Sequence, residues 1–139
     1  MDEKRNVILW TGLAAGTFCM ELVMVTLTPL SATGTRFGSY GMFYNLLWCG
    51  GSYIIPLILY CQEIRLMKYV IGCVNGFWLI CHPAIAVLCF GGAAMGYSGI
   101  WKAASGIPET ASLMTAGVLS ATAFVTGILW YPMCRKKKA

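Results

Sequence analysis

The chain has 139 residues, of which 58% are hydrophobic and 11% are charged, and its formal net charge is +5. Its mean hydropathy is +0.71, whereas an average soluble domain carries about 25% charged residues. The composition therefore excludes an ordinary soluble domain and indicates one membrane domain, residues 1–139.

Four long apolar segments follow one another along the chain, at residues 7–30, 40–61, 69–97 and 110–134. Each has the roughly 20 residues that cross a hydrocarbon core of about 30 Å. Backbone groups in lipid must bond within the protein, and the alternating strands of a barrel are not evident, so the segments are expected to be helices. Their short links predict an all-α, compact, antiparallel four-transmembrane-helix bundle.

The basic residues predict the orientation of this bundle, because cytoplasmic segments carry an excess of lysine and arginine. The side with both termini carries eight of them: Lys4, Arg5, Arg65, Lys68, Arg135, Lys136, Lys137 and Lys138. The other side carries Arg36 and Lys102. Both termini are therefore expected in the cytoplasm, and the positive charge is interpreted as an orientation signal and a contact with anionic lipid, not with nucleic acid.

Glycine pairs four residues apart predict where a helix meets another helix closely, either within this chain or from a partner. Small residues at this spacing let two helix backbones meet in lipid, where apolar burial gives no net drive. The first segment has one such pair, the third segment has two, and the fourth offers a smooth face around a single glycine. The predicted packing positions are Gly12, Gly16, Gly72, Gly76, Gly92, Gly96 and Gly117.

Glu21 stands inside the apolar run GTFCMELVMVTLT of the first segment. At about 1.5 Å per residue it lies about 21 Å from the cytoplasmic surface, and His82, Asn45 and Ser120 lie at about 18, 24 and 21 Å. A carboxylate this deep costs at least about 2.5 kcal/mol, so it needs a partner or a proton. We therefore expect Glu21 to point inward, to bond to His82, Asn45 or both, and to share a polar layer with Ser120.

Three roles are open for this layer. It is a proton or cation site, a polar contact that holds the helices together, or a docking point for a polar group of another subunit. The pair is an ion pair if His82 is protonated, and otherwise Glu21 is a neutral acid.

No catalytic, cofactor or metal site is predicted. The seven cysteines include no C-x-x-C pair and none lies in an outer loop, which excludes a disulfide-bonded ectodomain. His82 is the only histidine, and no ligand cluster with zinc spacing accompanies it. The protein is therefore expected not to be an enzyme.

The chain ends in KKKA, which places Lys136 and Lys137 at the fourth and third positions from the end. On a cytoplasmic tail this pattern resembles a dilysine retrieval signal of the early secretory pathway. The alternative is a basic stop to the last helix. The expected locations are the endoplasmic reticulum and secretory pathway or the plasma membrane.

The layout resembles that of the MARVEL-type tetraspan proteins, and the strings FCMELVMV in the first segment and AGVLSATAFVTGILWYP in the fourth carry the resemblance. The resemblance implies a role in membrane organisation, in vesicle trafficking, or in accompanying a larger membrane protein. It brings no catalytic motif.

The expected function is that of a non-enzymatic auxiliary, assembly or trafficking subunit in the lipid bilayer. Its partner is a larger integral membrane protein or a second copy of the chain. The alternative is a small proton-coupled transporter or ion pathway that uses Glu21. A membrane-embedded enzyme is the third hypothesis, and no motif supports it.

Overall fold

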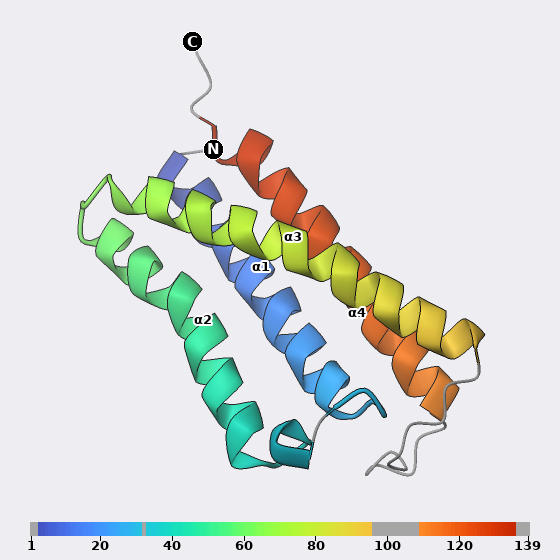
Figure 1. The fold of residues 1–139 in the computed structure, drawn as a ribbon. Helices are drawn as coiled ribbons and strands as arrows, with labels where there is room; N and C mark the ends of the chain where they lie inside the picture. The colour runs from blue at the N-terminus through green and yellow to red at the C-terminus, as the bar shows by residue number, and fades with distance from the viewer. Residues whose placement is uncertain (1–2, 32, 96–108, 136–139) are drawn as a thin grey trace.

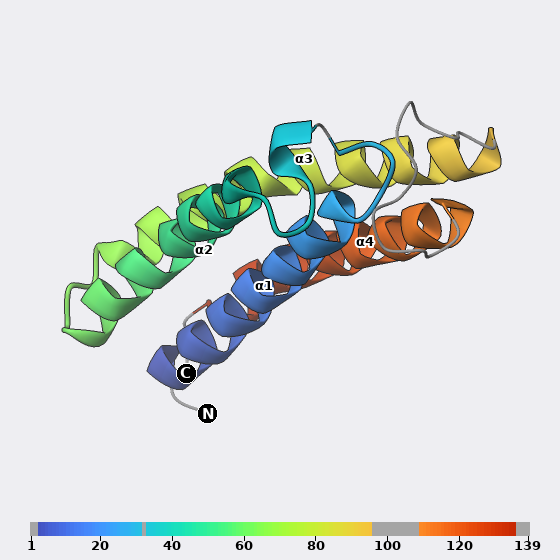
Figure 2. The same ribbon diagram turned by 90° about the horizontal axis from the view of Figure 1, so that it is seen from below.

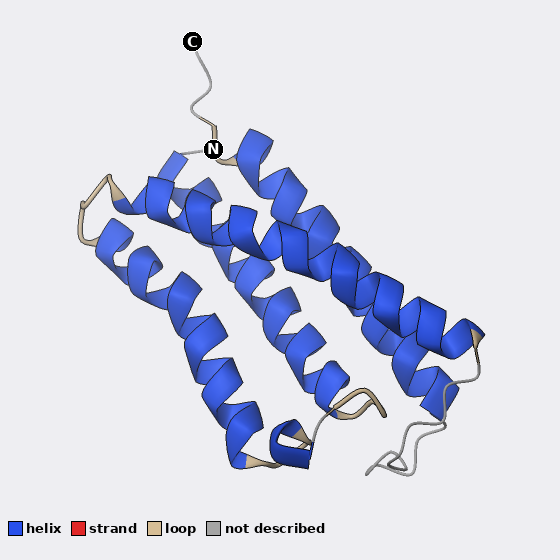
Figure 3. Cartoon of the chain, in the orientation of Figure 1, coloured by secondary structure: helices blue, strands red, loops and turns tan. Residues whose placement is uncertain are grey.

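The computed structural model describes residues 3–31, 33–95 and 109–135, and in this part of the chain it is helical with no strand (Figure 3). The four long helices are α1 (Glu3–Thr26), α2 (Tyr40–Cys61), α3 (Met67–Ala94) and α4 (Glu109–Met133), and a short 3-10 helix, η1 (Thr33–Thr35), precedes α2. All four are long and apolar enough to cross a membrane. The prediction of four apolar helices is confirmed to this extent.

Successive helices run in opposite directions, so the start of α1 and the end of α4 lie at the same end of the bundle (Figure 1). The side-chain amide of Asn6 donates to the Met133 carbonyl at 3.2 Å and joins these two ends. Seen at 90° to this view, α2 and α3 form one layer and α1 and α4 form the other (Figure 2). The most extensive contacts are those of α4 with α3 and with α1, whereas α2 packs less closely.

Buried residues recur every three or four positions on α1 and α4, which is the spacing of one helix face. On α1 this face consists of Val7, Thr11, Ala14, Phe18 and Glu21. On α4 it consists of Ser112, Ala116, Ser120, Ala123, Gly127 and Trp130, most of which are small. The small side chains of α4 allow α1 and α3 to approach it, which explains why α4 is the central helix of the contacts.

The ends of three helices differ from the sequence prediction, and those of α4 (Glu109–Met133) differ from the predicted 110–134 by only one residue. α1 begins at Glu3 and ends at Thr26, where 7–30 was predicted. An acidic residue in the first turn favours the earlier start, and Pro29 restricts Thr28 and cannot donate to the helix, which favours the earlier end. α3 begins at Met67 and ends at Ala94; Tyr97, the predicted end, lies outside the described residues.

The predicted glycine faces have different outcomes. An added Cβ at Gly72 would lie 3.4 Å from the Trp130 ring, one at Gly76 would lie 3.0 Å from the Tyr131 hydroxyl, and one at Gly117 would lie 2.8 Å from the Phe90 ring. Gly92 is buried in α3, and Gly96 lies outside the described residues.

Gly12 and Gly16 do not pack against another helix of the described chain, so of the two predicted contacts, within this chain or with a partner, the first does not form at this pair. Both are exposed, and an added Cβ would meet nothing within 4 Å. The side chains of α1 that bond to α4 are those of Thr11, Thr17 and Glu21. The glycine pair is therefore left on an outer face of the bundle.

Candidate functional site: a buried glutamate–histidine cluster

Three helices bring Glu21, His82 and Ser120 together in the interior of the bundle. The Ser120 hydroxyl donates to Glu21 Oε1 at 2.5 Å, and His82 Nδ1 lies 2.6 Å from Glu21 Oε2. The side chain of His82 is 4% exposed and that of Glu21 is 0% exposed. α1 and α3 lie diagonally across the bundle and otherwise contact little, so this cluster is a polar connection between them in the bundle interior.

Glu21 and His82 each face the other with one atom that has no further polar partner among the described residues. Glu21 Oε2 and His82 Nδ1 form no hydrogen bond that meets normal geometry with any described residue, although they lie at ion-pair distance. The Phe18 ring meets the His82 ring edge to face, with centroids 5.1 Å apart. A carboxyl and an imidazole at this separation can share or exchange one proton. They can equally serve as a fixed link between α1 and α3.

Asn45 does not belong to the cluster: of the two partners expected for Glu21, His82 and Asn45, it is His82 that lies at ion-pair distance. Its side chain is exposed on α2, and it lines a hollow together with Thr26, Thr35 and Met42. Depth along a helix does not fix the face of the helix on which a side chain lies. In α2 the buried face consists of Met42, Cys49, Gly50, Tyr53 and Pro56.

A second buried polar cluster was not predicted, and it centres on Asn75 of α3. The Tyr53 hydroxyl of α2 donates to Asn75 Oδ1 at 3.2 Å. Asn75 Nδ2 donates to the Gly127 carbonyl of α4 at 2.8 Å. One signal in the sequence could have identified it: Asn75 precedes His82 by seven residues, which is two helical turns, so both side chains lie on one face of α3.

Neutral hydrogen bonds continue this polar interior toward the end of the bundle where the termini lie. Trp130 Nε1 of α4 donates to the Thr11 hydroxyl of α1 at 2.9 Å. The hydroxyls of Thr17 and Thr126 lie 3.3 Å apart between the same two helices. The α1–α4 contact is therefore held by polar groups as well as by small side chains.

Two ion pairs close the same end of the bundle. Lys4 Nζ lies 2.6 Å from Glu63 Oε1, and Lys68 Nζ lies 2.6 Å from Glu3 Oε1. The hydrogen bond from Lys4, with its positive charge, holds the pKa of Glu63 below its ordinary value. Both groups of the Lys4–Glu63 pair are well exposed, so this pair contributes little to stability.

The burial of Glu21 affects one of the three roles expected for it, that of a docking point for another subunit. The carboxyl is occupied by His82 and Ser120 of its own chain and is 0% exposed, so another subunit does not reach it in this arrangement. Within residues 3–31, 33–95 and 109–135, no three His, Cys, Asp or Glu side chains are placed to hold a metal ion. Lys136 and Lys137 of the candidate retrieval signal lie outside the described residues.

Four long apolar helices around buried polar clusters define this chain as a helical bundle compatible with a membrane. The chain belongs to the family of unknown function DUF5391, which matches residues 1–139. It is 33% identical over 89 residues to the uncharacterized protein YxaJ of Bacillus subtilis strain 168. This alignment covers 62% of the chain and 63% of YxaJ, so the chain spans less than two thirds of that relative. No solved structure matches the chain.

Proposed function

We propose that this chain is an integral membrane protein with four transmembrane helices and both termini in the cytoplasm. It acts without catalysis, as a small subunit that packs against a larger membrane protein or a second copy of itself. Large apolar side chains at exposed positions support insertion, among them Leu47, Ile80 and Val87. The eight-to-two division of basic residues supports the orientation.

The observation that carries the assembly role is the uncovered glycine pair of α1. Gly12 and Gly16 face away from the other helices with nothing within 4 Å of an added Cβ. Leu9, Leu13 and Met20 are exposed on the same helix. In lipid, a pair of small residues one turn apart on an apolar face is a surface on which a second helix packs. An added Cβ at Gly72 or Gly76 would meet Trp130 or Tyr131 of α4, whereas the α1 pair meets no other helix in the described part of the chain.

The plasma membrane is the location that we propose. The relative YxaJ comes from a bacterium, and bacterial cells have no endoplasmic reticulum. On this basis Lys136 and Lys137 act as the basic stop to α4 and as a contact with anionic lipid, not as a retrieval signal. The resemblance to MARVEL-type proteins stays a prediction about layout and adds no partner to the proposal.

The test is co-purification of two differently tagged copies and of any larger partner from membranes in mild detergent. Gly12→Ile combined with Gly16→Ile should abolish the association, because two branched side chains keep a second backbone away. Gly91→Ile is the matched control, since Gly91 also has nothing within 4 Å of an added Cβ but lies on α3. A chain that elutes alone and is unchanged by either variant would contradict the assembly role.

A second function, a proton pathway, is favoured by the Glu21–His82 pair. A buried acid and imidazole that depend on each other are the groups that a membrane proton relay uses. Proton uptake into liposomes that contain the purified protein distinguishes this function from a structural link. A pathway loses its flux with Glu21→Gln and retains it with Asn75→Leu, whereas a structural link gives no flux in any form.

A further inference from the structure

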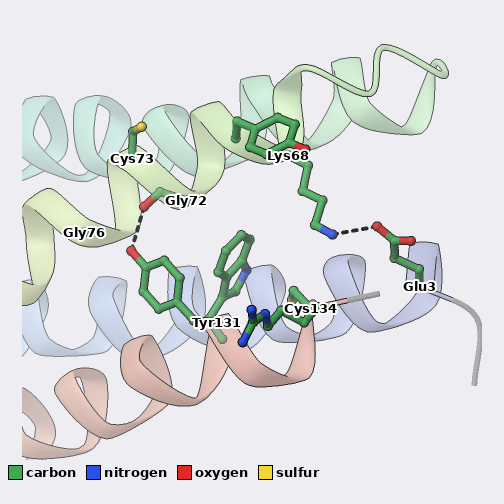
Figure 4. A pocket seen from close by; sticks show the side chains of 10 residues that line it. Glu3, Lys68, Gly72, Cys73, Gly76, Tyr131 and Cys134 are labelled. Carbon is green, nitrogen blue, oxygen red and sulfur yellow. Dashed lines mark hydrogen bonds and ion pairs between the residues drawn. The ribbon is translucent and has the colours of Figure 1, made fainter. Parts of the chain in front are cut away.

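A groove of about 1080 Å³ lies between α3 and α4 at the end of the bundle that holds both termini (Figure 4). Lys68, Gly72, Cys73 and Gly76 line it from α3, while Tyr131 and Arg135 line it from the end of α4. It is separate from the Glu21–His82 cluster, which lies deeper in the bundle, and from the outer α1 face of Gly12 and Gly16.

Along one face of α3, the wall of the groove begins with a lysine and continues with two glycines, which carry no side chain. Lys68, Gly72 and Gly76 follow one another at four-residue intervals, so the wall extends about 12 Å from the lysine. The Tyr131 hydroxyl donates to the Gly72 carbonyl at 2.8 Å and bridges the two helices beside the groove (Figure 4). No side chain of α3 enters the groove at the two glycines, where Trp130 and Tyr131 of α4 form the opposite wall, and the thiol-bearing Cys73 is exposed beside them. The inner part of the groove is therefore a slot between helix surfaces.

The open end of the groove carries two cations and one acid. Lys68 is paired with Glu3 at 2.6 Å, and its side chain is 20% exposed. Arg135 is exposed, and three lysines follow it in the sequence. The two cations and the acid give the groove lining a net charge of +1. This end of the bundle is the one that the basic residues assign to the cytoplasmic surface of the membrane.

We propose that this groove binds an anionic phospholipid from the cytoplasmic leaflet. Lys68 and Arg135 contact the phosphate and the negatively charged headgroup, and one acyl chain lies along Gly72, Cys73 and Gly76. Positive charge at the interface above an uncharged slot matches a molecule with an anionic head and an apolar tail. The inference rests on the proposed membrane location but is independent of the proposed partner.

The test is native mass spectrometry of the full chain in mild detergent, with added phosphatidylglycerol or, as the neutral probe, phosphatidylcholine. Lys68→Gln combined with Arg135→Gln should weaken phosphatidylglycerol binding at least about fivefold, the effect of losing at least one cation near an anionic headgroup. Arg5→Gln combined with Arg65→Gln is the control. It removes the same charge from two exposed positions outside the groove, and binding should change less than about twofold.

Two further variants test the groove without removing a cation. Cys73→Trp fills the slot and should weaken phosphatidylglycerol binding, whereas Ile80→Trp at an exposed position of α3 outside the groove should not. Glu3→Gln removes the acid beside Lys68 and should strengthen binding, a gain that a misfolded chain cannot give.

Three results would overturn the proposal. They are equal binding of phosphatidylcholine and phosphatidylglycerol, equal losses in the groove and control charge variants, and no effect of Cys73→Trp. None of these results depends on whether a partner co-purifies, so failure of the lipid site and failure of the assembly role are told apart.

Discussion

Of the two buried polar clusters in the bundle, one contains an acid and an imidazole and the other contains neither. The Glu21–His82–Ser120 cluster joins α1, α3 and α4, and it consists of an acid, an imidazole and a hydroxyl. The cluster formed by Tyr53, Asn75 and the Gly127 carbonyl joins α2, α3 and α4 and is neutral. Both use α3 as the shared helix, since Asn75 and His82 lie two turns apart on one face.

The two clusters differ in the kind of group that is left without a partner when one of their side chains is removed. In the neutral cluster each removed group leaves an uncharged donor or acceptor, and such interhelical bonds in membranes are worth about 0.6 kcal/mol on average. In the Glu21–His82–Ser120 cluster the remaining group is a buried ionisable side chain whose facing atom, Glu21 Oε2 or His82 Nδ1, has no other hydrogen-bond partner among the described residues. A neutral cluster is thus sufficient to fix helix positions. Burying an acid and an imidazole in a membrane costs more free energy, so a function beyond packing is expected at Glu21 and His82.

The largest effect is expected from His82→Ala, which leaves Glu21 Oε2 without a partner. Breaking a buried pair by removing one member costs about 3–5 kcal/mol, measured as the shift in unfolding free energy on titration with a denaturing detergent. Glu21→Leu combined with His82→Leu should recover most of this loss, because apolar replacement removes both buried ionisable groups together. If His82→Ala costs no more than Asn75→Leu, the two clusters do not differ as described.

The next largest effect is expected from Gly127→Val, which acts on the backbone of the neutral cluster. An added Cβ at Gly127 lies 2.8 Å from Leu79 Cδ2 and 3.3 Å from Asn75 Oδ1. Overpacking of this kind costs about 1–3 kcal/mol, measured in the same titration. Gly12→Val is the matched control on the open face of α1 and should have little effect. Equal losses in the two variants would show that α4 does not pack tightly at Gly127.

Asn75→Leu and Tyr53→Phe should have smaller effects, which sharpen the comparison between neutral and charged contacts. Leucine has the same branched shape as asparagine and a somewhat larger volume, but it leaves the Tyr53 hydroxyl unpaired. Tyr53→Phe removes that hydroxyl. We expect a loss of about 0.5–2 kcal/mol for Asn75→Leu and less for Tyr53→Phe. In the double variant the two losses should not add, because both remove the same bond. Additive losses would mean that Tyr53 and Asn75 act independently.

The sequence predicted the helices better than it predicted the faces that they present. Length and hydropathy located all four apolar helices, since these properties do not depend on neighbours. Depth along each helix brought Glu21 to the level of His82 and Ser120, but it also included the exposed Asn45. Rotation about a helix axis depends on the packing of the other helices, which sequence depth does not contain.

The glycines show the same limit in another form. Four-residue spacing identified the Gly72–Gly76 face, which packs on Trp130 and Tyr131. It also identified Gly12 and Gly16, which the bundle leaves uncovered. Gly127, which stands close to Leu79 and Asn75, belongs to no such pair with another glycine and was missed. Spacing shows that a face is smooth, and only the arrangement of the helices shows what covers it.

The smallest effect is expected from Lys4→Gln, which removes an ion pair that lies outside both clusters. The Lys4 ammonium holds the pKa of Glu63 below its ordinary value, so the pair stabilises the fold above that ordinary pKa, about 4.3. Its contribution is lost as the pH falls through the lowered pKa of Glu63. At neutral pH the variant should be less stable than the wild type by less than any buried-cluster variant, and the difference should vanish in acid. A loss as large as that of Asn75→Leu would show that position in the bundle interior does not govern the strength of these contacts.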